Sequence, residues 1–288
     1  MKQFFSYITF QIIFKIFKDN KLNGIGLLIV LFILIGSILA DYVSPYPPDF
    51  QNYQDARQSP SLKHPFGTDL FGRDILSRII HGTRVSIMVG ILSMIISSVF
   101  GTTLGLIAGY YGKWIDVVIM RIMDTLMAFP AILLALLIMS VLGPSLANAI
   151  IAVGIIYVPT FARLIRASAL SIREKQYMDA ARVIGMPSWL IMIKVILLNS
   201  LSPLIVQITL GIGYAILVEA GLSFLGLGVQ PPTPAWGSML GEARNFMMFM
   251  PWMSIFPGLA IFMTVIGFNL MGDGLREVLD PKKIDHDR

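Results

Sequence analysis

Long runs of apolar residues, separated by shorter polar segments, are the main pattern along the 288-residue chain. A helix needs about 20 consecutive apolar residues to cross the hydrocarbon layer of a membrane. A search of the chain for such runs predicts six membrane-spanning helices. Their expected ranges are 22–41, 86–110, 117–142, 146–167, 193–217 and 253–273. The predicted fold class is therefore an all-α membrane protein with six transmembrane helices.

The ends of the chain and the first long polar segment set the expected organisation. The first 21 residues mix lysines with phenylalanine and isoleucine, a basic amphipathic pattern that predicts a helix in the headgroup layer, with a cleaved signal peptide as the alternative. Segment 41–84 is polar and rich in proline, which indicates a loop outside the membrane. We expect three parts: 1–85, with the interfacial helix, first span and extracytoplasmic loop; a core over 86–281, with a cytoplasmic loop at 168–192; and a cytoplasmic tail at 282–288.

Glycine and proline positions predict how the spans pack and bend. Gly101, Gly105 and Gly109 recur every four residues, a ridge of small residues that allows a second helix to approach closely. Pro130, Pro159 and Pro203 lie inside the third, fourth and fifth predicted spans, where each removes a backbone N–H and is expected to kink the helix, unless it serves ordinary packing.

Composition and charge narrow the class of protein. Hydrophobic residues make up 56% of the chain and charged residues 14%, which indicates an integral membrane protein. The chain has no cysteine, so disulfides and thiolate chemistry are excluded. With both termini in the cytoplasm, sixteen of the 22 Lys and Arg residues lie on the cytoplasmic side, which agrees with the positive-inside rule. Because the basic residues are sorted by side of the membrane, we do not expect them to serve nucleic-acid binding. The six on the outside are Arg57, Lys63, Arg73, Arg78, Arg84 and Arg244.

Motifs for nucleotide binding and catalysis are missing from the sequence. The nearest match to a phosphate-binding loop, at 112–114, lacks the upstream glycine and the hydroxyl residue. His64, His81 and His286 are isolated, and no glycine-flanked serine nucleophile is found. We therefore expect no catalytic residue, metal or cofactor in this chain.

A few polar residues in or near the spans are candidates for function. Asp116, Arg121, Asp124 and Glu219 are ionisable; we expect Arg121 and Asp124, three residues apart, to neutralise each other. Glu219 either lines a vestibule or orients the glycine-rich segment that follows it. Candidate residues for a translocation pathway, which alternatively bond a neighbouring helix, are Glu219, Asn148, Asn199, Gln207 and Asn269.

The stretch YMDAARVIG, residues 177–185, lies in the predicted cytoplasmic loop. Its small residues and the glycine that ends it predict a short helix with a sharp turn, a shape suited to docking a partner, or an ordinary solvated helix-turn-helix. The stretch resembles the signature of ABC importer permeases: Asp179 stands in place of the family's Glu, followed by Ala180, Ala181 and, after three residues, Gly185. Further on, Val195 replaces Ile and Leu198 replaces Pro.

Three further segments look like those of the dipeptide, oligopeptide and nickel transport permeases, specifically the second of the two paired permeases. They are HPFGTDLFGRDILSRIIHGTR (64–84), GLSFLGLGVQPPTPAWGSML (221–240) and FPGLAIFMTVIGFNLMGDGLREVLDP (256–281).

This resemblance implies a type I ABC importer in the plasma membrane of a prokaryote. It implies as partners a homologous second permease, two cytoplasmic ATPase subunits that bind ATP and Mg, an extracytoplasmic solute-binding protein and membrane lipid. On that basis Asp179, Ala180, Ala181, Arg182 and Gly185 couple ATP hydrolysis to transport.

The resembling subfamily moves dipeptides, oligopeptides, glutathione, nickel and metallophore complexes, and the spans do not decide among these solutes. The rival hypotheses are a secondary carrier or channel without ATPase subunits, and a membrane enzyme.

Overall fold

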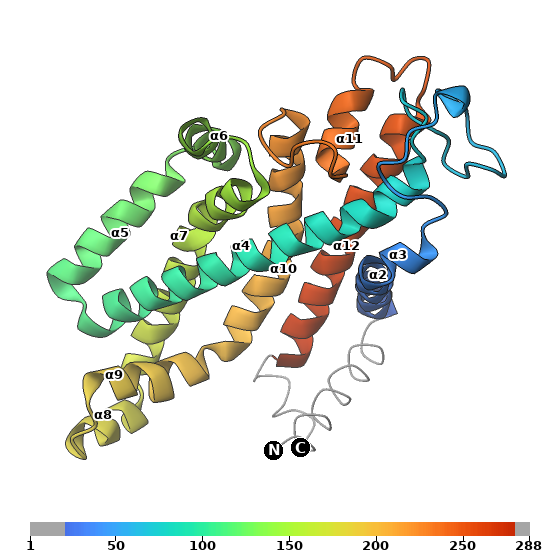
Figure 1. The fold of residues 1–288 in the computed structure, drawn as a ribbon. Helices are drawn as coiled ribbons and strands as arrows, with labels where there is room; N and C mark the ends of the chain where they lie inside the picture. The colour runs from blue at the N-terminus through green and yellow to red at the C-terminus, as the bar shows by residue number, and fades with distance from the viewer. Residues whose placement is uncertain (1–20, 280–288) are drawn as a thin grey trace.

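The computed structural model describes residues 21–279, and within that range the regular structure is helical apart from one isolated bridge between Thr68 and Asp74 (Figure 1). Five helices are long and apolar enough to cross a membrane, and a bent pair of shorter helices makes a sixth crossing if it is one span. The predicted all-α membrane protein is confirmed. The five long helices are α2 (Lys21–Ile38), α4 (Ile75–Tyr111), α7 (Leu146–Arg173), α10 (Leu201–Phe224) and α12 (Trp252–Leu279).

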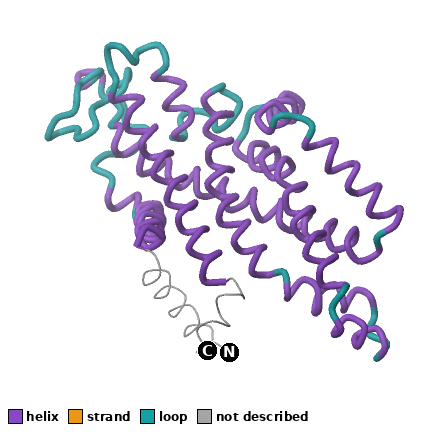
Figure 2. Tube along the Cα trace, turned by 180° about the vertical axis from the view of Figure 1, so that it is seen from behind, coloured by secondary structure: helices purple, strands orange, loops and turns teal. Residues whose placement is uncertain are grey.

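The third predicted span is not a continuous helix. The chain forms α5 (Lys113–Met127) and α6 (Ala131–Leu142), and their axes differ by 92°. Figures 1 and 2 both show α6 nearly end-on beside the inclined α5. Pro130 lies at the break, where it precedes the first residue of α6. A proline has no N–H to donate and disfavours a helical conformation in the residue before it, so α5 stops short of Pro130. The bend expected at this proline is present, and it takes the form of a break between two helices.

The second and fifth spans also have different limits from those expected. Helix α4 begins at Ile75 rather than at 86, because the Asp74 side chain accepts a hydrogen bond from the Ser77 N–H (2.8 Å) and caps the helix. Helix α10 begins at Leu201, which places Pro203 in its first turn. A missing N–H costs nothing there, and the helical run of the fifth predicted span is interrupted at Ser200, three residues before the proline.

Short helices occupy the connections at both ends of the bundle. Helices α8 (Gln176–Val183) and α9 (Ser188–Leu190) and the π-helical segment η2 (Ile191–Leu197) join α7 to α10. At the other end, α3 (Ala40–Val43) and η1 (Tyr53–Asp55) lie in the segment between α2 and α4, and α11 (Trp236–Ala243) lies between α10 and α12. Figure 1 shows α8 and the end of α12 toward the bottom of the bundle, with α11 and the segment before α4 at the opposite end. The interfacial helix expected at the N-terminus and the tail at 282–288 lie outside the described residues.

Helices α4 and α7 form the most extensive helix pair, and the predicted glycine ridge lies at their contact. A Cβ atom on Gly101 would come within 2.5 Å of the Phe161 Cβ, and one on Gly105 within 2.5 Å of the Ala162 carbonyl oxygen. The two backbones are therefore close enough that only glycine fits, which confirms the role expected of the ridge.

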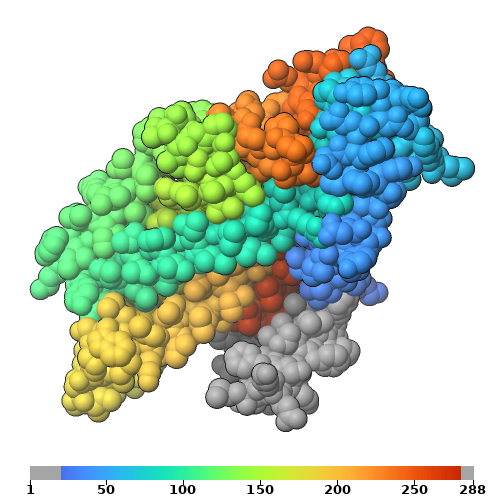
Figure 3. All heavy atoms as spheres, viewed as in Figure 1, coloured from blue at the N-terminus to red at the C-terminus, as the bar shows by residue number. Residues whose placement is uncertain are grey.

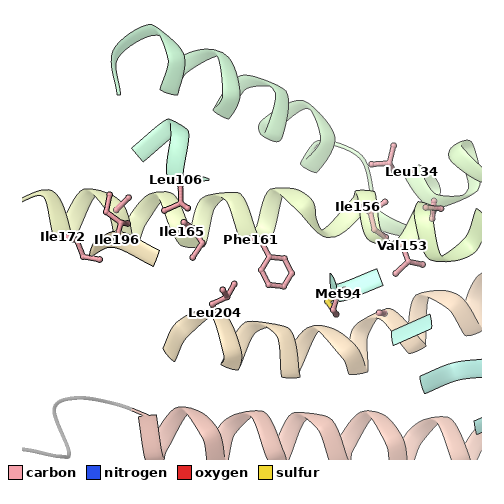
Figure 4. Close-up of a cluster of buried hydrophobic side chains, with 14 of the residues drawn as sticks. Met94, Leu106, Leu134, Val153, Ile156, Phe161, Ile165, Ile172, Ile196 and Leu204 are labelled. Carbon is pink, nitrogen blue, oxygen red and sulfur yellow. The ribbon is translucent and has the colours of Figure 1, made fainter. Parts of the chain in front are cut away.

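A continuous apolar core follows α7 from end to end. Figure 4 shows Ile172, Phe161 and Val153 along this helix, with Leu204 of α10 and Met94 of α4 facing them. At one end the cluster reaches the connection between α7 and α10, where Met178, Ala181 and Ile191 belong to it. A displacement of that connection is therefore transmitted to close-packed side chains rather than absorbed by a loose loop.

Candidate functional site

Helix α8 carries the stretch identified in the sequence, and its end has a defined hydrogen-bonding pattern. The Met186 N–H donates to the Ala181 carbonyl (3.1 Å), and the Gly185 N–H donates to the Arg182 carbonyl (3.0 Å). This pair of bonds is a Schellman motif, which requires a left-handed residue just beyond the helix. Gly185 supplies it, with φ at +74°. The sharp turn expected at this glycine is confirmed.

The inner face of α8 packs on the body of the protein. Met178 is completely buried and Ala181 nearly so, and both belong to the core that follows α7. The small side chain of Ala181 therefore lets α8 pack closely against the core that follows α7. Ala180, on the other side of α8, is exposed.

Two polar contacts tie the connection around α8 to the end of α4. The Arg173 Nη1 donates to the Gly109 carbonyl (3.0 Å), which joins the ends of α7 and α4. The Tyr110 hydroxyl donates to the Ser188 Oγ (3.1 Å), which joins α4 to α9. With the apolar contacts of Met178, these bonds link α8 to the two helices that share the glycine ridge.

The outer face of α8 exposes apolar side chains. Val183 and Ile184 are 87% and 74% exposed, and Tyr177 and, on α9, Trp189 are also exposed. Figure 3 shows this part of the chain protruding at the lower left of the molecule. A cluster of exposed apolar groups outside the spans is typical of a surface that binds another protein. None of these four residues was singled out in the sequence, although three of them lie in the stretch YMDAARVIG and the Val183-Ile184 pair at the end of a polar helix was an available signal.

The charged residues of α8 lie on the same outer surface. Asp179 and Arg182 are both exposed, and the Arg182 Nη1 lies 3.5 Å from the Asp179 Oδ1. An exposed ion pair of this length contributes little to stability, so both groups remain available to a partner.

The five residues predicted for the pathway are spread along the bundle. Asn199 is exposed beyond η2 and donates to the Val195 carbonyl of its own turn (2.6 Å), whereas Glu219 lies near the other end of α10. Gln207 and Asn269 are half-buried on α10 and α12. At the turn between α6 and α7, Asn148 donates to the Leu142 and Gly143 carbonyls (2.8 and 3.0 Å).

Glu219 is fully buried and acts on the segment that follows α10. The Ser223 Oγ donates to the Glu219 Oε1 (2.6 Å) and accepts from the Val229 N–H (3.2 Å). This chain of bonds orients the segment after Phe224, which agrees with the second of the two roles considered for Glu219.

The acidic residues of α5 pair across to α7. Asp116 binds the Arg166 guanidinium through both carboxylate oxygens, and the Arg163 Nη2 donates to the Asp124 Oδ1 (2.6 Å). The expected pairing of Asp124 with Arg121 was wrong, because α7 lies alongside α5 and offers a better placed guanidinium. The geometry so far describes a helical membrane protein with bent spans and a short, anchored helix outside them, an architecture that fits a transport permease.

Comparison with known proteins agrees with this class. The profile of the family described as binding-protein-dependent transport system inner membrane component matches residues 101–285, and that of the N-terminal TM domain of oligopeptide transport permease C matches residues 9–60. The chain therefore belongs to the family of binding-protein-dependent transport system inner membrane components.

Individual relatives cover almost the whole chain. It is 50% identical to the dipeptide transport system permease protein DppC of Alkalihalophilus pseudofirmus, over 93% of this chain and 88% of that protein. It is 48% identical to the glutathione transport system permease protein GsiD of Pectobacterium atrosepticum, over 93% and 89% of the two chains. Identity to the dipeptide transport system permease protein DppC of Haemophilus influenzae is 46%, over 92% of each chain. The resemblance noted in the sequence is thus confirmed.

Proposed function

We propose that this chain is the membrane subunit of an ATP-driven importer for peptides, and that α8 is the site where an ATPase subunit docks. Relatives named for dipeptide and glutathione transport support a small peptide as the solute. Nickel and metallophore complexes have no support from these relatives. The remaining partners in the proposal are a homologous second permease, a second ATPase subunit and an extracytoplasmic solute-binding protein.

The observation that carries the proposal is the two-sided character of α8. One side buries Met178 in the core, and the other exposes Val183 and Ile184 to water. Exposed apolar side chains on a short, well-anchored helix fit a groove on a partner protein. A partner that closes on ATP would move α8 and, through the core, move α4 and α7. ATP and Mg would be bound by the partner, and this chain would contribute no cofactor.

The proposed orientation places α8, both termini and the α4–α5 turn in the cytoplasm. The distribution of Lys and Arg supports it. Figure 1 supports it further, since α8 and the last turn of α12 lie at one end of the bundle and α11 at the other. The segment before α4 would then face the solute-binding protein.

Co-purification tests the proposal. Ile184→Asp places a charge in the apolar surface of α8 without touching the core, and we expect it to abolish co-purification of the ATPase subunits and ATP-dependent uptake. Met248→Asp is the matched control, because Met248 is 92% exposed between α11 and α12 at the opposite end of the bundle. Normal co-purification of the ATPases with Ile184→Asp would contradict docking on α8. Absence of ATPases from the wild-type complex would instead favour a secondary carrier or channel.

A further inference from the structure

The backbone changes its helical pattern between η2 and α10. Within η2 it is π-helical, which means that each N–H bonds a carbonyl five residues back. At Ser200 the pattern tightens, because the Ser200 N–H donates to the Leu197 carbonyl only three residues back (2.9 Å). Regular α-helix then begins at Leu201. We call residues 197–203 the joint.

Backbone hydrogen bonds across the joint are incomplete, and two side chains add bonds beside it. Pro203 has no N–H, so the Asn199 carbonyl lacks the helical donor that normally lies four residues further on. The Asn199 Nδ2 donates to the Val195 carbonyl (2.6 Å), and the Ser200 Oγ donates to the Ile196 carbonyl (2.8 Å). Bonds of this kind compete with the regular helical pattern and often bend helices. The direction of α10 relative to η2 therefore depends on two side chains.

The segments on the two sides of the joint have different main packing partners. Ile191 and Ile196 of η2 are buried in the same core cluster as Met178 of α8 and Ile172 of α7. Helix α10 has its most extensive contact with α12, and in the described part of the chain α12 has no extensive contact with α8 or η2. Figure 1 shows the chain crossing the bottom of the bundle through α9 and then turning upward into α10. The joint thus connects a body that contains α8 to a span whose main partner is α12.

We propose that the joint is the hinge through which a displacement of α8 changes the tilt of α10, and that Asn199 and Ser200 are the positioning residues that set its angle. This inference rests on the proposed function, because it takes an ATPase subunit as the source of the displacement. The buried contacts of Ile196 make η2 move with α8, and the missing backbone bond at Pro203 lets the chain bend before α10. Asn199 then serves coupling rather than a translocation pathway.

Uptake per ATP hydrolysed tests the positioning role. Ser200→Ala removes the donor to the Ile196 carbonyl with little change in volume. In the reconstituted importer we expect the ATPase subunits to remain bound and ATP hydrolysis to persist, while the number of peptides imported per ATP falls about tenfold, the equilibrium factor of one hydrogen bond. Ser168→Ala is the matched control, because it removes the same kind of bond, to the Leu164 carbonyl (3.1 Å), from inside α7. It should not change the uptake per ATP.

Substitutions at Asn199 separate positioning from a general loss of structure. Asn199→Ala should lower the uptake per ATP as Ser200→Ala does. Asn199→Ser should retain it, because a serine hydroxyl can also bond the carbonyl four residues back. Normal uptake per ATP in both Asn199→Ala and Ser200→Ala would overturn the positioning role, and so would an equal loss in Asn199→Ser and Ser168→Ala.

Pro203→Ala tests the hinge in the opposite direction. It supplies an N–H to the Asn199 carbonyl and should stiffen the joint, so we expect an importer that is no less stable but imports fewer peptides per ATP. Spin labels on Glu174→Cys, beside α8, and Leu217→Cys, in α10, report the tilt, since the natural chain has no cysteine. Leu217 lies about 25 Å beyond Ser200 at 1.5 Å per residue, so a tilt of about 10° moves it by about 4 Å.

In the wild-type importer we expect the distance between these two labels to change when ATP binds, and in Pro203→Ala we expect a smaller change. Labels on Glu174→Cys and Ile151→Cys are the control pair, because both positions belong to α7 and its C-cap, and their distance should stay constant. An equal change in the wild type and Pro203→Ala, or no change in either, would overturn the hinge. A wild-type importer without ATP-dependent peptide uptake would refute the proposed function instead, whatever the label distances.

Discussion

The close contact between α4 and α7 makes a quantitative prediction for Gly101→Ala. The new Cβ would lie 2.5 Å from the Phe161 Cβ and 2.6 Å from the Val158 carbonyl oxygen. An ordinary contact between carbon atoms is about 3.5–4.0 Å, so the helices must separate by roughly 1 Å or distort. Overpacking of this kind costs about 1–3 kcal/mol.

Gly258→Ala is the control variant that separates the overpacking cost from the change in helix propensity. Gly258 also lies inside a long helix, α12, but an added Cβ there meets no atom within 4 Å. Replacing a helical glycine by alanine favours the helix by about 0.5–1 kcal/mol in both variants. The difference between the two free energies of unfolding is therefore the overpacking alone, and we expect Gly101→Ala to be less stable than Gly258→Ala by about 1–3 kcal/mol.

Reversible unfolding in mixed detergent micelles, followed by circular dichroism, measures this difference. ATP-driven uptake by the same variants shows whether a shifted α4 also impairs transport, as we expect. If the two variants unfold with free energies equal within about 0.5 kcal/mol, α4 and α7 are not in close contact at Gly101 and the reasoning fails.

Three further predictions follow from contacts elsewhere in the chain. Asp116→Asn should destabilise the protein by about 1–3 kcal/mol, since it leaves the partly buried Arg166 without its counter-ion; a double-mutant cycle with Arg166→Gln measures the coupling, and additive effects would refute it. Trp236→Phe should cost about 1–2 kcal/mol in the unfolding free energy, because the buried indole N–H loses its bond to a carbonyl of α4 (3.0 Å); a neutral effect would contradict that bond. The hydrogen bond from Lys63 holds the pKa of Asp55 below its usual value, so this pair stabilises its loop above about pH 4 and loses its effect as the pH falls through the lowered pKa. Lys63→Met should raise the pH at which the loop becomes sensitive to an acid-active protease, and an unchanged pH profile would count against the pair.

Much of the helical layout was predictable from the sequence because the membrane requires long apolar runs. The runs indicated the five long helices and the bent pair α5–α6, and the spacing of Gly101, Gly105 and Gly109 indicated the contact surface of α4. The sequence alone could not show whether Pro130 kinks one helix or separates two helices, because the packing around a proline decides between these outcomes. The same limit applies to Pro203, whose effect depends on where α10 begins.

In the candidate site too, features encoded by neighbouring residues were predictable, whereas features set by packing between helices were not. Gly185 and the helix before it were predictable, because a Schellman motif is encoded within a few residues. Which side of α8 faces the core was not predictable, so the exposed apolar surface at Val183 and Ile184 was not singled out. The pairing of Asp124 with Arg163 also depends on the position of α7, and spacing along α5 alone led to the wrong partner, Arg121.

The central claim is that an ATPase subunit covers the outer face of α8. The most direct measurement uses Ile184→Cys as the single cysteine of this chain, since the natural sequence has none. In the assembled importer we predict that this thiol is protected from a water-soluble maleimide and crosslinks to the ATPase subunit, and that removal of that subunit restores labelling. A thiol that reacts equally fast with and without the ATPase subunit would contradict the account.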